Sequence, residues 1–349
     1  MKRSLALSLS ALLLCGGILG QRVEVKADKP NTRVEVSVDG KLFTALRWDE
    51  RIRRPVLFPI MSPGGNFITR GFPVETRDNE AVGHPHQVGA SLVYGDVNGI
   101  DFWNNSPFRT AAELQKMGTI VLKKVLSQNG GKGRGKLTFE SEWLAPDGSV
   151  MLREVSKYDF HAKGDLRWID RQTLLIAAND DVTFGDNKEG FFAVHLNTQL
   201  QSPDQVPAKI SSAAGVVSER TSHEGLTGSY FTSEGLTGSS LWGTAAKWAA
   251  VTGRIGNEPV TVAVFDFPKN LNFPSNMMVR PYGLLALNPF GQKAFAVDRG
   301  ERTFVLKKDH MLVFRHRLLV ATGNLTRKEL ESEYQKFASS ALNRSVVRI

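Results

Sequence analysis

Hydrophobic and polar residues alternate at every second position along much of the chain. This is the period of a β-strand with one buried face. The clearest segments are RVEVSV (33–38), GKLTFESEW (135–143), SVMLREVSKYDF (149–160), LRWIDRQTLLIA (166–177), FFAVHL (191–196), EPVTVAVFDF (258–267) and HMLVFRHRLLV (310–320). Short connections between such segments predict roughly fifteen strands and an all-β protein.

Three dipeptides predict tight turns between these strands: Asp39-Gly40, Asn98-Gly99 and Asp147-Gly148. A type I′ hairpin turn requires a positive φ at both central residues, which Asn, Asp and Gly tolerate best. We therefore expect antiparallel hairpins at all three positions.

A helical spacing of apolar residues occurs once, in TRKELESEYQKFASSAL (326–342). Leu330, Tyr334 and Phe337 would share one face, and Thr326 would cap the N-terminus. The expected fold is a large antiparallel β-sandwich with a C-terminal helix. No linker divides residues 21–349, which we expect to form a single domain.

Residues 1–20 have the features of a secretory signal peptide. Lys2 and Arg3 precede an apolar run at 5–14, too short to span a bilayer. Export to the periplasm or medium is expected, and the alternative is a lipoprotein modified at Cys15. Because Cys15 is the only cysteine, the mature chain would have neither disulfides nor cysteine-based catalysis.

The net charge of +9 comes from 44 basic and 35 acidic residues, and loss of Lys2 and Arg3 would leave +7. The basic residues are scattered beside Pro and Gly, as in solvated loops. NGGKGRGK (129–136) lacks the strand-to-helix setting of a phosphate-binding loop. We expect no nucleic-acid partner, and no further segment is apolar enough to enter a membrane.

The first candidate site lies in GHPHQVGASLVYGDVNGIDFWNN (83–105). If Asn98-Gly99 is a hairpin turn, one face of the hairpin carries two carboxylates between two aromatic rings, and those residues are Tyr94, Asp96, Asp101 and Trp103. Opposed carboxylates are unfavourable unless a cation, a proton or a ligand hydroxyl intervenes. A sugar suits this arrangement, with its C–H face on the rings. The alternative is that both acids accept hydrogen bonds from the turn backbone.

Histidines supply the candidate chemistry. His84 and His86 have the same strand parity as Tyr94, and His195 shares a strand face with Glu189 in KEGFFAVHL (188–196). These four residues are candidates for acid–base catalysis. The three imidazoles are also candidates for binding a divalent metal, and the sequence does not separate the two possibilities.

Two further segments are notable. In RPYGLLALNPFG (280–291), Arg280 and Asn288 flank an apolar middle, and the planar fork of Arg280 could clamp a carboxylate or a pair of hydroxyls. A near-repeat, SHEGLTGS (222–229) and SEGLTGS (233–239), predicts a duplicated surface loop.

Several motifs, in register over nearly all of the chain, resemble a secreted bacterial family known as the PmoA family or methane oxygenase PmoA. They include RPVLFPI, TRGFP, GHPHQVG, YGDVNGIDFWNN, KEGFFAVHL, RPYGLLALNPFG and FRHRLLVATG. The resemblance implies an exported protein with a β-sandwich similar to the galactose-mutarotase type. It also matches Lys188 and Glu189 to a family KEG motif. The chain departs from the family at Gln87, where a histidine is common, and at His195, where an arginine is common.

Three functions follow as hypotheses. The leading one is an exported carbohydrate-active enzyme that hydrolyses, eliminates or epimerises a sugar with His84, His86, Glu189 and His195. In it, Tyr94, Asp96, Asp101, Trp103, Lys188, Arg280 and Asn288 would contact the substrate. The alternatives are a non-catalytic carbohydrate-binding protein and a histidine-rich copper site.

Overall fold

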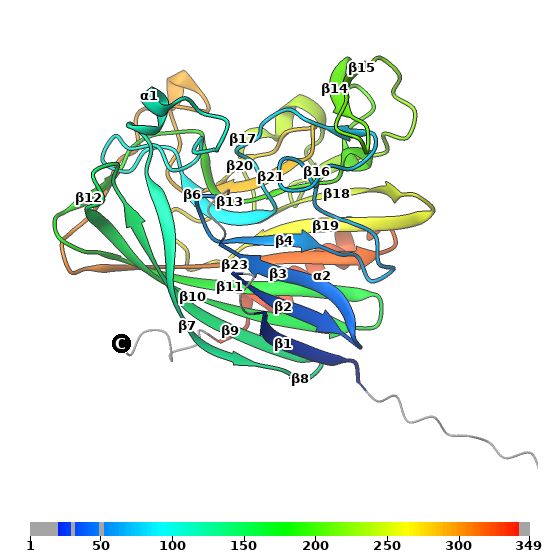
Figure 1. The fold of residues 1–349 in the computed structure, drawn as a ribbon, viewed down its shortest axis with the longest axis horizontal. Coiled ribbons are helices and arrows are strands. Elements are labelled where there is room, and N and C mark those ends of the chain that lie inside the picture. The colour runs from blue at the N-terminus through cyan, green and yellow to red at the C-terminus, as the bar shows by residue number, and fades with distance from the viewer. Residues whose placement is uncertain (1–19, 29–31, 49–51, 342–349) are drawn as a thin grey trace, which may run out of the picture.

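The computed structural model describes residues 20–28, 32–48 and 52–341, so nearly all of the expected signal peptide lies outside it. Two large antiparallel sheets dominate the described chain (Figure 1). The first has the order β17 (Trp242–Ala245), β20 (Asn276–Met278), β21 (Leu284–Asn288), β13 (Gly190–His195), β6 (Ala90–Tyr94), β4 (Val56–Ile60), β3 (Lys41–Arg47), β2 (Arg33–Val38), β1 (Arg22–Asp28) and β8 (Gly131–Lys132).

The second sheet has the order β16 (Ser229–Thr232), β18 (Trp248–Ile255), β19 (Glu258–Asp266), β23 (Met311–Thr322), β11 (Leu166–Ala177), β10 (Val150–Lys163), β9 (Arg134–Leu144) and β7 (Thr119–Asn129). Two small sheets pair β12 (Val182–Phe184) with β22 (Phe304–Leu306), and β14 (Ala208–Ser211) with both β15 (Val217–Arg220) and β5 (Glu80–Ala81). The predicted antiparallel all-β fold is confirmed. The strands are more numerous than expected because many short ones lie within the connections.

The main core lies between the two large sheets. It combines Val36, Phe192 and Val194 of the first sheet with Phe139 and Val262 of the second. These residues have the parity that the alternation predicted, because successive side chains of a strand point to opposite faces. Phe191 and Ala193, on the other face of β13, are also buried, in a second apolar cluster. The face of β13 that was expected to be an open cleft is therefore largely covered.

The predicted turns differ in their detail. Asp39 and Gly40 have φ of 51° and 78°, and Asn98 and Gly99 have φ of 53° and 78°, as a type I′ turn requires. At Asp147-Gly148 only the glycine has a positive φ, and the backbone N–H of Ala145 donates to the carbonyl of Ser149. This last connection is thus a longer loop than predicted.

The C-terminal helix α2 (Arg327–Ala338) is confirmed, and it covers the outer face of the second sheet. Thr326 and Glu329 form a capping box that satisfies backbone N–H groups at its first turn. Leu330, Tyr334 and Phe337 are buried, and the ring of Phe337 lies 5.5 Å from that of Phe267. The short helix α1 (Ala111–Leu114) was not predicted. Within the described ranges, no helix has the length and apolar character needed to cross a bilayer.

Replacing Phe337 by Ala tests how much α2 contributes to stability. The fully buried ring would leave a cavity against the second sheet, so the free energy of unfolding should fall by about 3–5 kcal/mol. Urea denaturation measures the change. The exposed Ser332 on the same helix is the control, since Ser332→Ala should stay within about 0.5 kcal/mol. Equal effects of the two substitutions would show that the helix packing contributes little.

Candidate functional site

A histidine-bearing loop at 81–88 is held in place by the buried side chain of Arg70. The Arg70 guanidinium donates to the carbonyl oxygens of Ala81 at 3.0 Å, Gly83 at 2.6 Å and His84 at 3.0 Å. It also reaches the carbonyl of Gln87 at 3.4 Å. Arg70 is only 2% exposed. Its hydrogen bonds to four carbonyls hold the backbone of the loop in place.

Arg54 holds the same loop from its other side. Its guanidinium, which is 4% exposed, donates to the carbonyls of Phe102 and Trp103 at 3.2 and 3.0 Å, and to the carbonyl of His86. Burial lowers the pKa of both arginines to about 10, opposed mainly by Asp101 for Arg54 and Glu80 for Arg70. Both groups therefore stay charged at neutral pH.

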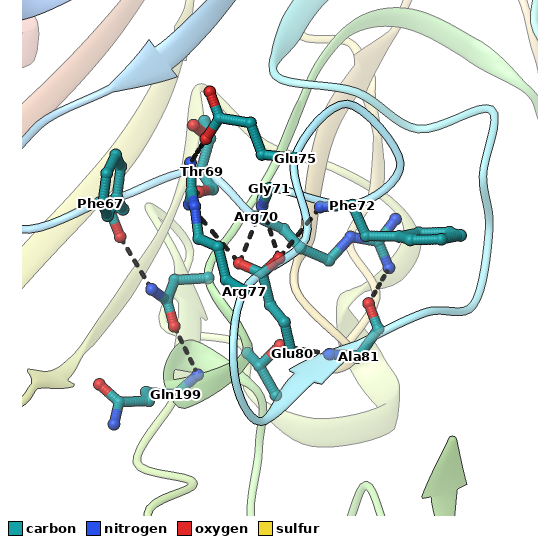
Figure 2. A network of polar contacts seen from close by, with 12 residues as sticks. Phe67, Thr69, Arg70, Gly71, Phe72, Glu75, Arg77, Glu80, Ala81 and Gln199 are labelled. Carbon is teal, nitrogen blue, oxygen red and sulfur yellow. Dashed lines mark hydrogen bonds and ion pairs between the residues drawn. The ribbon is translucent and has the colours of Figure 1, made fainter. Parts of the chain in front are cut away.

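The base of the loop is anchored by a carboxylate (Figure 2). Buried Glu80 accepts hydrogen bonds from the backbone N–H groups of Gly71 and Phe72 at 2.8 and 3.0 Å, and lies 3.6 Å from Arg77. The backbone N–H of Ala81 in turn donates to the hydroxyl of Thr198 at 2.8 Å. These contacts join the start of the loop to Gly71 and Phe72 and to the distant Thr198.

Three imidazoles form a cluster in which His84 and His195 flank the ring of Tyr282 and His86 adjoins His84. His84 stacks on Tyr282 with ring centroids 4.4 Å apart, and His195 lies 5.9 Å from the same ring. His86 lies 5.7 Å from His84 and 6.2 Å from Trp103. Tyr282 is presented by the tight turn that precedes β21, where the N–H of Arg280 donates to the carbonyl of Leu284.

A cavity of about 450 Å³ opens beside this cluster, within the usual range for small-ligand sites. Arg70, His84, His195 and Tyr282 line one side of it. The remaining lining is mixed polar and apolar, and includes Gln201, Asp204, Gln205, Val206, Pro207 and Lys209.

All three imidazoles are neutral at neutral pH. Burial lowers the pKa of His86 to about 3, helped by the charges of Arg54 and Arg109. Burial and the charges of Arg70 and Arg280 lower the pKa of His84. Burial likewise holds the pKa of His195 well below its usual value. The side chains of His84 and His86 make no hydrogen bond with any described residue, so their nitrogens are free for a ligand.

His195 is 2% exposed, and neither of its ring nitrogens has a partner with hydrogen-bond geometry in the described chain, although the nearby Tyr282 backbone slightly raises its pKa. It lines both the open cavity and a small internal one that it shares with His86 and Trp103. A buried polar group without a partner is costly, and sites that bind ligands or water are where such groups occur.

Glu189 lies at the other end of β13 from His195. Burial raises the pKa of its carboxyl, opposed by Lys188 and Arg280, with Lys188 Nζ 4.0 Å away. Arg280 thus acts electrostatically on both Glu189 and His84. No ion pair joins Glu189 to an imidazole in the described chain, so the carboxyl and the imidazoles share a charge environment without direct contact.

The expected aromatic platform is corrected. Tyr94 is 0% exposed, and its hydroxyl lies 2.7 and 2.9 Å from the carbonyl oxygens of Gly185 and Asn187, its possible acceptors, and accepts from the N–H of Asn187 at 2.9 Å. Trp103 is 2% exposed and packs in the same apolar cluster. Strand β6 ends at Tyr94, so the alternation used to place these rings does not continue past it.

Asp96 and Asp101 accept hydrogen bonds from the turn backbone, which was the alternative to a ligand site. Asp96 accepts from the N–H of Gly99 at 2.9 Å. Asp101 accepts from the N–H groups of Trp103 and Asn104 at 2.8 and 2.9 Å. Both carboxylates are satisfied by the turn backbone and need no ligand between them.

Asn288 also has a structural environment. It is 0% exposed, its amide donates to the carbonyls of Asn187 and Lys188, and its oxygen accepts from the N–H groups of Phe290 and Gly291. Lys188 is exposed beside Glu189. Asn288 therefore shapes the backbone that carries Lys188 and Glu189.

The expected metal site is not formed by these side chains. Among the described residues, no three His, Cys, Asp or Glu side chains are arranged to hold a metal ion. The rings of His84 and His195 lie 4.4 and 5.9 Å from the Tyr282 ring.

The sequence interpretation missed Tyr282, Arg70 and Arg54, which organise the site. Tyr282 stands in RPYGLL, a segment noted only for its ends, and Arg70 stands in TRGFP. Each acts through contacts with residues far away in the chain, such as Arg54 with Phe102 and Trp103. A buried arginine that binds carbonyl groups leaves no periodic signal in a sequence.

Comparison with solved structures finds proteins that are similar over most of this chain. The galactosidase domain of an α-galactosidase–sucrose kinase aligns with a TM-score of 0.39 and 8% identity, over 86% of this chain and 42% of its own. The Slr1438 protein of Synechocystis sp. PCC 6803 aligns with a TM-score of 0.33 and 10% identity, over 86% of this chain and 96% of its own. A candidate aldose 1-epimerase of Escherichia coli K12 aligns with a TM-score of 0.29 and 11% identity, over 87% of this chain and 100% of its own.

No curated protein matches the chain in sequence. The methane oxygenase name that accompanied the motif resemblance has no support from a family profile. The profile that does match covers residues 33–335, from the start of β2 into α2. The protein is therefore a member of the family described as "Family of unknown function (DUF6807)".

Proposed function

We propose that the protein is a carbohydrate-active enzyme that transfers protons to and from a sugar in the cavity beside Tyr282. The observation that carries this proposal is the cluster of imidazoles, neutral and without side-chain hydrogen bonds in the described chain, that lies at the cavity. Glu189, a carboxyl group whose pKa is raised, is subject to the same Arg280 charge as His84. Hydrolysis, elimination and epimerisation of sugars all require a base and an acid of this kind.

The roles follow from protonation state. His84 lines the cavity and is neutral, so it can accept a proton from a substrate hydroxyl, carbon or water. Glu189, with its raised pKa, keeps a proton to higher pH than an ordinary glutamate, so it can act as the acid. The charge of Arg280 favours the neutral form of His84.

The cavity lining supports a sugar as the ligand. Asp204, Gln205 and Lys209 supply acceptors and donors for hydroxyl groups, while Tyr282 and Pro207 supply apolar surface. This combination is typical of sites that bind the two faces of a sugar ring.

Turnover on a panel of glycosides and oxidised glycosides, with and without a chelator, tests the proposal. His84→Ala and Glu189→Gln should each lower kcat/KM by about 100-fold or more on any substrate found. The control is His310→Ala, because His310 is exposed and lies outside the site. If both site variants keep the full rate, the assignment is wrong; if sugars bind and no turnover occurs, the protein is a carbohydrate-binding protein.

The pH profile of kcat/KM gives a separate test. The base His84 becomes active above its lowered pKa, and the acid Glu189 stays active up to its raised pKa. The rate should therefore rise with pH through the lowered pKa of His84 and fall through the raised pKa of Glu189. Replacing Glu189 by Gln should remove the fall on the alkaline side. An optimum above pH 8 would contradict these roles.

Arg70 holds the loop that carries His84 and His86. Arg70→Lys keeps the charge but cannot reach four carbonyl groups, so the 81–88 loop should open more often. We expect amide hydrogen exchange in residues 81–88 to accelerate at least tenfold, with kcat/KM reduced. Arg220→Lys is the control, since Arg220 has one carbonyl partner at 3.4 Å. Unchanged exchange in Arg70→Lys would show that the loop holds itself.

The proposal includes export of the protein from the cytoplasm, because residues 1–20 have the pattern of a signal peptide. Sequencing the N-terminus of the protein recovered from the periplasm or medium of a bacterial host tests it. A mature N-terminus near residue 21 supports export. Retention of Met1 on cytoplasmic protein contradicts it.

A further inference from the structure

The two copies of the GLTGS motif face one hollow. Thr227, Gly228 and Ser229 of the first copy and Thr237, Gly238 and Ser239 of the second line a cavity of about 780 Å³. Both motifs turn at a glycine in the left-handed region, Gly225 with φ 77° and Gly235 with φ 79°. In each copy the leucine packs inward, Leu226 with 5% exposure and Leu236 against the main core. The duplication thus provides two anchored walls whose polar ends face the same space.

Several hydroxyl groups in these walls have no partner in the described chain. Ser229, Thr237 and Ser239 make no side-chain hydrogen bond with a described residue. Thr227 differs, since its hydroxyl binds the backbone of Gln199 and Arg254. Free hydroxyls on both walls are suited to a ligand rich in hydroxyl groups.

Arg280 and Trp242 line the same hollow. The guanidinium carbon of Arg280 lies 3.4 Å from the centre of the Trp242 ring, so the guanidinium is held against the indole. The ring of Phe295 packs edge-on against Trp242 at 5.0 Å. The orientation of the guanidinium is therefore set before any ligand arrives.

The hydrogen-bonding capacity of Arg280 is unused within the described chain. Its guanidinium makes no hydrogen bond or ion pair with any described residue, whereas Arg54 and Arg70 bind backbone carbonyls. A pre-oriented planar fork with free N–H groups is the protein group best matched to a carboxylate. Asp204, which also lines the hollow, is bound to Gln205 and would accept hydroxyl groups instead.

We propose that this hollow is a subsite that binds an acidic sugar residue, with Arg280 pairing with its carboxylate and the duplicated turns contacting its hydroxyls. This rests on the proposed function, because Asp204 lines both this hollow and the cavity beside Tyr282, so the acidic residue would lie next to the reacting sugar. The substrate class is then a uronate-containing oligosaccharide.

Calorimetric titration of the full chain with a galacturonic acid trisaccharide, and with the corresponding galactose trisaccharide, tests the inference. The acidic ligand should bind at least tenfold more tightly, and Arg280→Gln should weaken the acidic ligand about 10- to 100-fold more than the neutral one, so that the preference is lost. Arg280→Lys keeps the charge without the fork and should lie between the two. Arg254→Gln is the control, because exposed Arg254 bonds the carbonyl of Asn257 instead.

If the acidic trisaccharide binds no better than the neutral one, or if Arg280→Gln leaves its affinity unchanged, the subsite assignment is wrong. This outcome is separate from failure of the proposed function. Turnover of neutral sugars that depends on His84 and Glu189, without preference for the acidic ligand, would support the enzymatic function and contradict the subsite. Selective binding of the acidic ligand without any turnover would keep the subsite and remove the enzyme.

Discussion

The candidate site depends on two buried guanidinium groups that bind backbone carbonyls. Arg70 and Arg54 together reach the carbonyls of seven residues, five of which belong to the 81–88 loop. Charged donors make stronger hydrogen bonds than neutral ones, and a planar fork can serve several acceptors at once. The loop, which has no strand partner beyond Ala81, is thereby held without regular secondary structure.

The same two charges determine the chemistry that the loop can perform. A cation beside an imidazole opposes its protonation, and burial acts in the same direction. Arg54 and Arg70 therefore contribute to the neutral state of His86 as well as to its position. Their own burial is tolerable because the carboxylates of Asp101 and Glu80 act on them electrostatically while binding other backbone groups. The same two arginines therefore hold the loop in place and favour the neutral state of His86.

The period of the hydrophobic pattern was sufficient to predict the fold. It predicted only part of the site. Segment 166–177 became β11 with the same bounds, and α2 buries the three side chains that its spacing indicated, because both depend on local periodicity. Strand parity failed for Tyr94 and Trp103, since the strand ends and a second apolar cluster covers that face. Of the expected site residues, His84, His86 and His195 do form one cluster, but its centre includes Tyr282, which no local pattern indicated.

Three arginines lie near the site, and they differ in whether their N–H groups bind the protein itself or stay free for a ligand. Arg54 and Arg70 are nearly fully buried, and their N–H groups are engaged by carbonyls. Arg280 is partly exposed and held by the Trp242 ring alone, which orients a guanidinium without using its hydrogen-bond donors. A chain that needed only structural support at this position would gain more from a carboxylate or carbonyl partner, because hydrogen bonds to a charged group contribute more than stacking at a partly exposed site. The donors of Arg280 therefore stay available to a ligand in the hollow, in an orientation that the Trp242 ring has already set.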